Sequence, residues 1–178
     1  ANTAITATNL SALGGKTAGT VTVSNAVAIS GTTAEVTAAL VTADTLVVLD
    51  DAATVTITGN PTINQLNDIA AKTTGVVTAT LAANSLSNLA DLSTAGTDVI
   101  TITVNDAADT EITAAALSAL GGKTAGTVTV ENAVAIEGDH DDIIAALVTA
   151  DTKVSIHSAV TVTFNDANDT DITAEELS

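Results

Sequence analysis

Three segments of the chain are rich in carboxylate and amide oxygens, the ligands that hard divalent cations prefer. They read NDAADTE from Asn105, EGDHDD from Glu137 and NDANDTD from Asn165, and together they hold nearly half of the 21 acidic residues. Ca²⁺ accepts about six to eight oxygens in flexible geometry, whereas Mg²⁺ demands stricter octahedral order. The pattern therefore predicts a Ca²⁺ site with ligands drawn from Asn105, Asp106, Asp109, Glu111, Glu137, Asp139, Asp141, Asp142, Asn165, Asp166, Asp169 and Asp171.

The same acidic segments have a second interpretation that needs no metal. Asp and Asn favour turns and helix N-termini, where a carboxylate satisfies backbone N–H groups and the helix dipole stabilises its charge. If the loops stack, their carboxylates lie within a Debye length of one another and repel, which a divalent cation would relieve. Solvated caps and a Ca²⁺ site both remain open, while His140 and His157 are expected at the surface.

Threonines at alternate positions of short β-branched runs form the second candidate surface. Alternation in a strand sends such hydroxyls to one face while Val and Ile face inward. A flat, Thr-rich sheet resembles the ice-binding face of some β-solenoid antifreeze proteins, so the alternative function is a recognition surface for glycans or ice. Its residues are Thr20, Thr22, Thr78, Thr80, Thr101, Thr103, Thr127 and Thr129.

Catalysis has little support in the sequence, and we expect no enzymatic activity. Serines occur without a His and Asp arrangement typical of a nucleophilic triad. The GGK sequences at Gly14 and Gly121 lack the spacing of a phosphate-binding loop and are interpreted as helix ends.

Composition narrows the class of protein further. Four basic residues against 21 acidic ones give a formal net charge of −17, which disfavours nucleic acid and anionic membrane surfaces as partners. There is no Cys, and no apolar run approaches the length that a membrane span needs. Hydrophobic residues make up 46% and aromatics only 1%, so the core must consist of Val, Ile, Leu and Ala in thin, regular layers.

Internal repetition is the strongest signal in the chain. The segment ITATNLSALGGKTAGTVTVSNAVAISG from Ile5 recurs as ITAAALSALGGKTAGTVTVENAVAIEG from Ile112. A second relation places TVNDAADTEITAAALS from Thr103 beside TFNDANDTDITAEELS from Thr163. These matches indicate units of about 27 to 30 residues, each with one or two β-branched runs followed by an amphipathic Ala- and Leu-rich stretch.

The units predict an α/β fold, a repeat solenoid of about six strand(-strand)-helix turns with a stacked parallel sheet, spanning residues 1–178 as one domain. Thr32 and Glu35 have the spacing of a capping box, and between Val76 and Val104 the second strand is weak. Strands are expected at 21–23, 27–29, 46–49, 55–57, 76–80, 99–104, 128–130, 134–136, 154–156 and 160–164. Helices are expected at 5–13, 34–41, 63–71, 86–92, 112–120, 143–148 and 172–177.

Phrases such as LSALGGKTAGTVTV and AALVTADT, together with the composition, resemble the Ala-, Thr-, Val- and Asp-rich repeat arrays of very large bacterial surface proteins of the adhesin, S-layer-like or sheath type. The resemblance implies export to the bacterial cell surface, calcium dependence and service as a stalk, coat or fibre. The glycine-rich calcium nonapeptide of many such proteins is absent, so no calcium ligands carry over.

Similar sequence at the two ends predicts either a segment of a longer array or a filament subunit that stacks head to tail on copies of itself. Surface glycans are a further expected partner. The sequence thus predicts a structural, extracellular repeat protein without catalytic activity.

Overall fold

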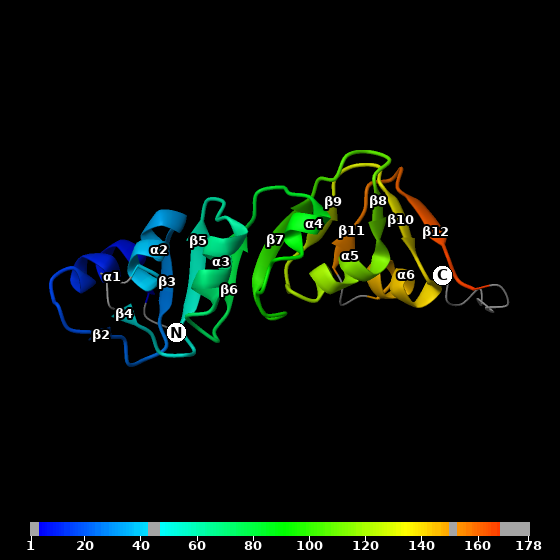
Figure 1. Cartoon of the computed structure of the whole chain (residues 1–178). Helices are drawn as coiled ribbons and strands as arrows, with labels where there is room; N and C mark the ends of the chain where they lie inside the picture. The colour runs from blue at the N-terminus through cyan, green and yellow to red at the C-terminus, as the bar shows by residue number, and fades with distance from the viewer. Residues whose placement is uncertain (1–3, 43–46, 150–152, 168–178) are drawn as a thin grey trace.

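The structure is a computed structural model, and it describes residues 4–42, 47–149 and 153–167. These residues form a mixed α/β fold with a parallel sheet of seven strands and six helices. Figure 1 shows an elongated arrangement in which the chain advances from α1 at one end to β12 at the other. None of these helices has the length that a membrane crossing would require.

All the strand pairs among the described residues are parallel, and in each sheet the strands lie side by side in chain order or its reverse. The seven-stranded sheet contains β1 (Ala4–Thr6), β3 (Ala28–Thr32), β5 (Thr54–Thr58), β6 (Val77–Thr80), β7 (Val99–Val104), β9 (Val128–Val130) and β11 (Val154–Ser155). Two smaller sheets contain β2 (Val21–Thr22) with β4 (Val47–Val48), and β8 (Glu111–Thr113) with β10 (Ala135–Gly138) and β12 (Thr161–Phe164).

Each helix begins beside a side chain that caps its first backbone N–H groups. The helices are α1 (Ala7–Gly14), α2 (Thr33–Leu40), α3 (Ile63–Ala70), α4 (Leu86–Leu89), α5 (Ala114–Gly121) and α6 (His140–Leu147). Their caps are Thr6, Thr32, Thr62, Ser85, Thr113 and Asp139. The capping box of Thr32 and Glu35 is confirmed.

Two sequence predictions are wrong at the start of equivalent helices. Ile5 and Ile112 lie in strands β1 and β8, not in helices, and α1 and α5 begin two residues later. The Thr that follows each Ile is the helix N-cap in an extended conformation, so the helix cannot reach back through it. The helix expected at 172–177 lies outside the described residues.

Small aliphatic side chains fill the core, as the composition predicts. Strand pairing aligns Ile5 with Ile29, Ile29 with Val55, and Val55 with Val77, and the last three are almost fully buried. Because partners in a parallel sheet point to the same face, each such column is a continuous layer of branched side chains about 4.8 Å apart.

Strand β7 pairs with a different neighbouring strand along each half of its length. Its first half, from Val99 to Thr101, pairs with β6, and its second half, from Ile102 to Val104, pairs with β9. The weak second strand expected between Val76 and Val104 is reduced to an isolated bridge between Asn84 and Val104. Consequently β9 joins the large sheet, although its sequence repeats that of β2, which lies outside it.

Candidate functional site

The acidic loops place two equivalent carboxylates on the helix of the preceding unit. Asp106 Oδ2 accepts a hydrogen bond of 2.7 Å from the backbone N–H of Leu86, the first residue of α4. Asp166 Oδ2 accepts one of 3.0 Å from the N–H of His140, the first residue of α6. Both bonds satisfy an N–H that the helix itself leaves without a partner, so each carboxylate joins its own unit to the one before.

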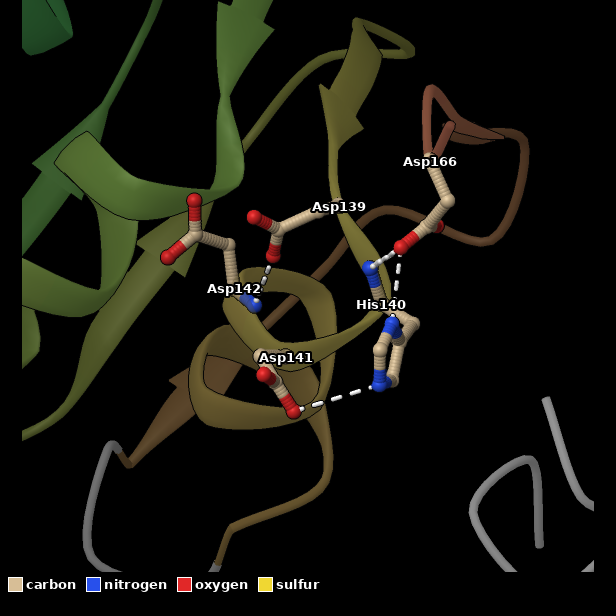
Figure 2. Close-up of polar contacts among 5 residues, drawn as sticks. All are labelled: Asp139, His140, Asp141, Asp142 and Asp166. Carbon is tan, nitrogen blue, oxygen red and sulfur yellow. Dashed lines mark hydrogen bonds and ion pairs between the residues drawn. The ribbon is translucent and has the colours of Figure 1, made fainter. Parts of the chain in front are cut away.

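Figure 2 shows how His140 extends this cap into a small charged cluster. Its Nδ1 lies 2.7 Å from Asp166 Oδ1, and its Nε2 lies 3.3 Å from Asp141 Oδ1. Both ring nitrogens therefore face carboxylates, an arrangement that suits the protonated imidazolium. The hydrogen bond from the His140 side chain lowers the pKa of Asp166 below its ordinary value.

The remaining predicted calcium ligands do not converge in the described part of the chain. Asp139 caps α6 by accepting from the N–H of Asp142 at 2.9 Å. Glu111 pairs with Ala135, whereas Glu137 pairs with Thr113 and Thr163 two positions along the strands. The two glutamates are therefore not opposite each other in the sheet.

The backbone sets the position of three further members of the predicted set. Asp109 has a left-handed backbone with φ of 62°, and its N–H donates to the Ala133 carbonyl at 2.9 Å. Asn105 and Asn165 each donate their backbone N–H to a neighbouring unit, to the carbonyls of Asn84 and Gly138. Asp169 and Asp171 lie outside the described residues.

The donor chemistry of these loops is thus directed mainly to backbone N–H groups. Within residues 4–42, 47–149 and 153–167, no group of three or more His, Asp or Glu side chains is arranged to hold a metal ion. Calcium binding stays a prediction, and the loops fit the alternative of capping residues at least as well.

The N-terminal half has a neutral loop at the equivalent position, and Glu35 joins the units there instead. Its Oε2 accepts from the N–H and hydroxyl of Thr32 at 2.8 and 3.0 Å, and its Oε1 accepts from the Thr8 hydroxyl of α1 at 2.7 Å. The backbone hydrogen bond from Thr32, followed by the Thr8 hydroxyl, lowers the pKa of Glu35. One carboxylate thus closes its own helix and connects to the helix before it.

The structure separates the predicted threonine surface into pairs. Thr80 lies opposite Thr101, and Thr103 lies opposite Thr129, but Thr22 lies opposite Val48 in a different sheet. Thr78 lies opposite Val99, and Thr20 and Thr127 lie just before β2 and β9, both exposed. The shift of pairing along β7 prevents a single rank of these eight residues.

A longer hydroxyl column connects Thr78 to three residues outside the predicted set of eight. Strand pairing places Thr6 opposite Ser30, Ser30 opposite Thr56 and Thr56 opposite Thr78. The first three are exposed and Thr78 is half-buried. The signal that could have found this column is the Thr or Ser that follows each inward-facing Ile or Val.

The sequence analysis also missed two threonines, the buried Thr124 and the half-buried Thr73, that bind neighbouring units together. The Thr124 hydroxyl donates to the carbonyls of Asp98 and Ile100 at 3.0 and 2.9 Å, and it accepts from the N–H groups of Ile100 and Gly126. Thr73 does the same with the carbonyls of Asp51 and Ala53 and the N–H of Gly75. We call this arrangement the threonine clamp.

The glycine two residues after each clamp threonine lets the two backbones touch. A Cβ on Gly126 would overlap the Ile100 carbonyl, and one on Gly75 would overlap the Ala53 carbonyl. The signal in the sequence is the phrase Lys-Thr-x-Gly at Lys16, Lys72 and Lys123, of which the sequence analysis considered only the preceding GGK at Gly14 and Gly121.

One carboxylate outside the acidic loops completes the set of contacts between units. Asp98 is buried, and its two oxygens accept from the N–H groups of Val77 and Ala95 at 2.7 and 2.9 Å. Val77 opens β6 while Asp98 precedes β7, so the carboxylate spans two adjacent strands. It acts as a fixed acceptor for the buried N–H of Val77 and for the N–H of the exposed Ala95.

A scan against protein-family models, a search of curated proteins and a search of solved structures each found no match. The function must therefore be argued from these contacts alone. Thr73, Thr124, Asp98, Asp106 and Asp166 share one property, because each ties a side chain of one unit to the backbone of a neighbouring unit.

Proposed function

We propose that the chain is a structural repeat protein in which about six units coil one upon the next into a solenoid, giving a stiff rod at the bacterial cell surface. The chain works as one continuous domain and has no catalytic role. Its length and stiffness are its function, as a stalk, a filament or part of a surface coat.

The observation that carries this proposal is the recurrence of the same contacts between successive units. Thr73 and Thr124 clamp the backbone of the preceding unit, and Asp106 and Asp166 cap the helix of the preceding unit. Each bond connects residues 20 to 26 positions apart in the chain. Bonds that recur at this spacing hold a stack together along its axis, which is what a rod requires.

Small-angle X-ray scattering of the protein in solution tests the rod. A solenoid predicts a distance distribution with a long tail and one constant cross-section, in agreement with the elongated arrangement in Figure 1. A symmetric distribution typical of a compact sphere would contradict the proposal.

The location and the role of calcium belong to the same proposal and have their own tests. The net charge of −17 suits an exposed coat that repels neighbouring anionic surfaces. If Ca²⁺ bridges the acidic loops, EDTA lowers the melting temperature and added CaCl₂ restores it. An unchanged melting temperature would leave capping as the only role of these carboxylates.

The hydroxyl column of Thr6, Ser30, Thr56 and Thr78 favours a second candidate function, recognition of glycans or ice. Hydroxyls at strand spacing present a regular array of donors and acceptors on an exposed sheet. Thermal hysteresis and glycan-array binding measure the two possibilities directly. The absence of both effects would remove this candidate and leave the rod.

A further inference from the structure

A groove lies where helix α4 meets β8 and α5, and we call it the α4–α5 groove. Its volume is about 210 Å³, and its lining includes Leu86 of α4, Ala90 at the end of α4, Ile112 of β8 and Ala116 of α5. Leu86 and Ile112 are buried, whereas Ala90 is exposed, so the groove connects the edge of the core with the surface. A ligand that enters it meets mainly aliphatic side chains.

The shortness of α4 explains why there is room for a groove at this place. Helix α4 has four residues and α5 has eight. At a rise of about 1.5 Å per residue, α4 is only about half as long as its neighbour. It therefore covers less of α5 than a full-length helix would, and part of the side of α5 that faces it is left open.

Two acidic residues, Asp106 and Glu111, line the same groove. Asp106 Oδ2 accepts from the N–H of Leu86 at 2.7 Å, and this bond fixes the carboxylate beside the start of α4. Within the described residues, Asp106 Oδ1 and the Glu111 carboxylate make no hydrogen bond, and neither residue takes part in an ion pair. The groove thus combines an aliphatic lining with carboxylate oxygens that can still accept.

One ammonium group of the chain already binds next to this groove. Lys123 Nζ donates to the carbonyl of Ala90 at 2.7 Å. Ala90 lines the groove, but Lys123 does not, and no ion pair joins Lys123 to Asp106 or Glu111 in the part of the chain that the structure describes. The end of α4 therefore accommodates an ammonium, while the two carboxylates of the groove are not neutralised by it.

The groove between α1 and α2 is a useful contrast. It too contains an acidic residue, Glu35, among small side chains. Both oxygens of that carboxylate accept hydrogen bonds, one from the Thr8 hydroxyl and the other from the N–H and hydroxyl of Thr32. The chain itself satisfies the carboxylate in that groove, whereas the α4–α5 groove leaves this role to a ligand.

We propose that the α4–α5 groove binds a lysine side chain of a cationic partner protein. Lysine buries its methylene stem along apolar surface while its ammonium stays at a polar edge, which matches Leu86 and Ile112 with Asp106 and Glu111. A cavity of about 150 Å³ holds a benzene molecule, so about 210 Å³ has room for one such side chain. The net charge of −17 attracts a cationic partner over a longer range.

The aliphatic lining favours lysine over Ca²⁺ at this place, although both acidic residues belong to the predicted calcium set. Ca²⁺ requires about six to eight oxygen ligands. The side chains of Leu86, Ile112 and Ala116 offer none, but they suit a methylene stem. The proposal goes beyond the proposed rod and does not depend on it, because the groove involves only α4, β8, α5 and the loop that holds Asp106.

The probe is a short peptide with one lysine, acetyl-Ala-Lys-Ala-amide. One control peptide carries norleucine, which keeps the stem without the charge, and the other carries 2,3-diaminopropionic acid, which keeps the charge on a much shorter stem. Binding to the full chain is followed by ¹H–¹⁵N NMR at neutral pH with EDTA present. The lysine peptide is expected to shift the amide signals of Ala90, Ile112 and Ala116 and to bind at least about fivefold more tightly than either control.

Ala116→Leu blocks the groove from α5. Leucine is a good helix former, so the melting temperature is expected to stay at least as high as in the wild type, while affinity for the lysine peptide drops at least about tenfold. Ala115→Leu is the matched control, because Ala115 is exposed on the same helix and does not line the groove. Ala90→Leu blocks the groove from α4 if the first variant lowers the melting temperature.

Glu111→Gln tests the carboxylate with little change in shape. It should weaken binding of the lysine peptide and leave that of the norleucine peptide unchanged. Asp68→Asn removes the same charge from an exposed position of α3 and should affect neither peptide. Equal losses in these two variants would show that the lysine peptide senses only the net charge, which would overturn the proposal.

Three further results would overturn the lysine site. These are equal affinity for the lysine peptide and either control, unchanged binding in the blocked variants, and shifts spread evenly over the acidic segment 137–142 and the groove. The scattering test of the rod is separate from all of them, since a rod without this site and a compact protein with it would each be recognised.

Discussion

The two halves of the molecule place nearly identical repeats in different sheets. In the N-terminal half the strands that lead into helices, β1, β3 and β5, belong to the seven-stranded sheet. In the C-terminal half the equivalent strands β8, β10 and β12 form their own sheet, and β9 and β11 take the places in the large one. The repeated sequence therefore determines the unit, and the units between the halves determine which strand continues the sheet.

The halves also close their helix N-termini in different ways. In the N-terminal half Glu35 satisfies its own helix and contacts Thr8 of the helix before. In the C-terminal half Asp139 caps α6, and Asp166 from the following unit adds a second cap through His140. The same need, partners for the first N–H groups of a helix, is met within the unit in one half and partly from the following unit in the other.

Gly126→Ala is expected to give the largest effect, because it opens the close backbone contact between two central units. Its Cβ would overlap the Ile100 carbonyl, and neither backbone can move without breaking the pairing of β7 with β9. We expect a loss of about 3 kcal/mol in the free energy of unfolding, measured by urea denaturation. Gly19→Ala, in the identical sequence of the first unit, should change it by less than about 0.5 kcal/mol. Equal losses in both variants would contradict the clamp.

Asp98→Ala tests the junction at which the halves meet. The substitution leaves the buried N–H of Val77 and that of Ala95 without their acceptor, at a cost of about 3 kcal/mol. Asp50→Ala is the matched control, since among the described residues the Asp50 side chain accepts only the N–H of Ala52, in an exposed turn. Its expected cost is below about 1 kcal/mol. A similar cost at both positions, measured by urea denaturation, would show that Asp98 is not a special acceptor.

The local sequence pattern was sufficient to predict most of the strands. The runs Val99–Val104 and Val128–Val130 are confirmed with both bounds, because β-branched residues alternate there between polar breaks. Ile5 and Ile112 were assigned to helices because each directly precedes an amphipathic Ala- and Leu-rich stretch. Strands of three residues gain their stability from the neighbouring strand, so the sequence around them carries little signal.

The local sequence pattern could not predict the contacts between units. The glycine of Lys-Thr-x-Gly looks like a helix end in each unit taken by itself, and the need for it becomes visible only when the preceding strand lies against it. The change of sheet at β7 likewise depends on which partner each half of the strand finds. The acidic residues were recognised as one set, but the backbone N–H groups that Asp106 and Asp166 accept belong to other units.

Thr124→Val removes the clamp hydroxyl while keeping the shape of the side chain. The buried N–H groups of Ile100 and Gly126 lose an acceptor, and the expected cost is about 2 kcal/mol in the free energy of unfolding. Thr17→Val in the first unit should cost less than about 0.5 kcal/mol, because in the described part of the chain its hydroxyl accepts only from Gly19. Thermal and urea melts of both variants at a concentration without association measure the difference. Equal losses would mean that the two identical segments have the same surroundings.

The smallest expected effect is a dependence of stability on pH that compares the two capping arrangements. The folded chain lowers the pKa of Glu35 from 4.5 and that of Asp166 from 3.8. Carboxylates with lowered pKa values stabilise the fold above their ordinary values, and this contribution is lost as the pH falls through the lowered ones. The melting temperature should therefore decrease as the pH is lowered beneath about 4.5. In Glu35→Gln and in Asp166→Asn, this decrease should be smaller than in the wild type. Asp68→Asn, at an exposed position of α3, is the control for the removal of one carboxylate charge. A slope that neither capping variant changes would show that other carboxylates account for the acid sensitivity.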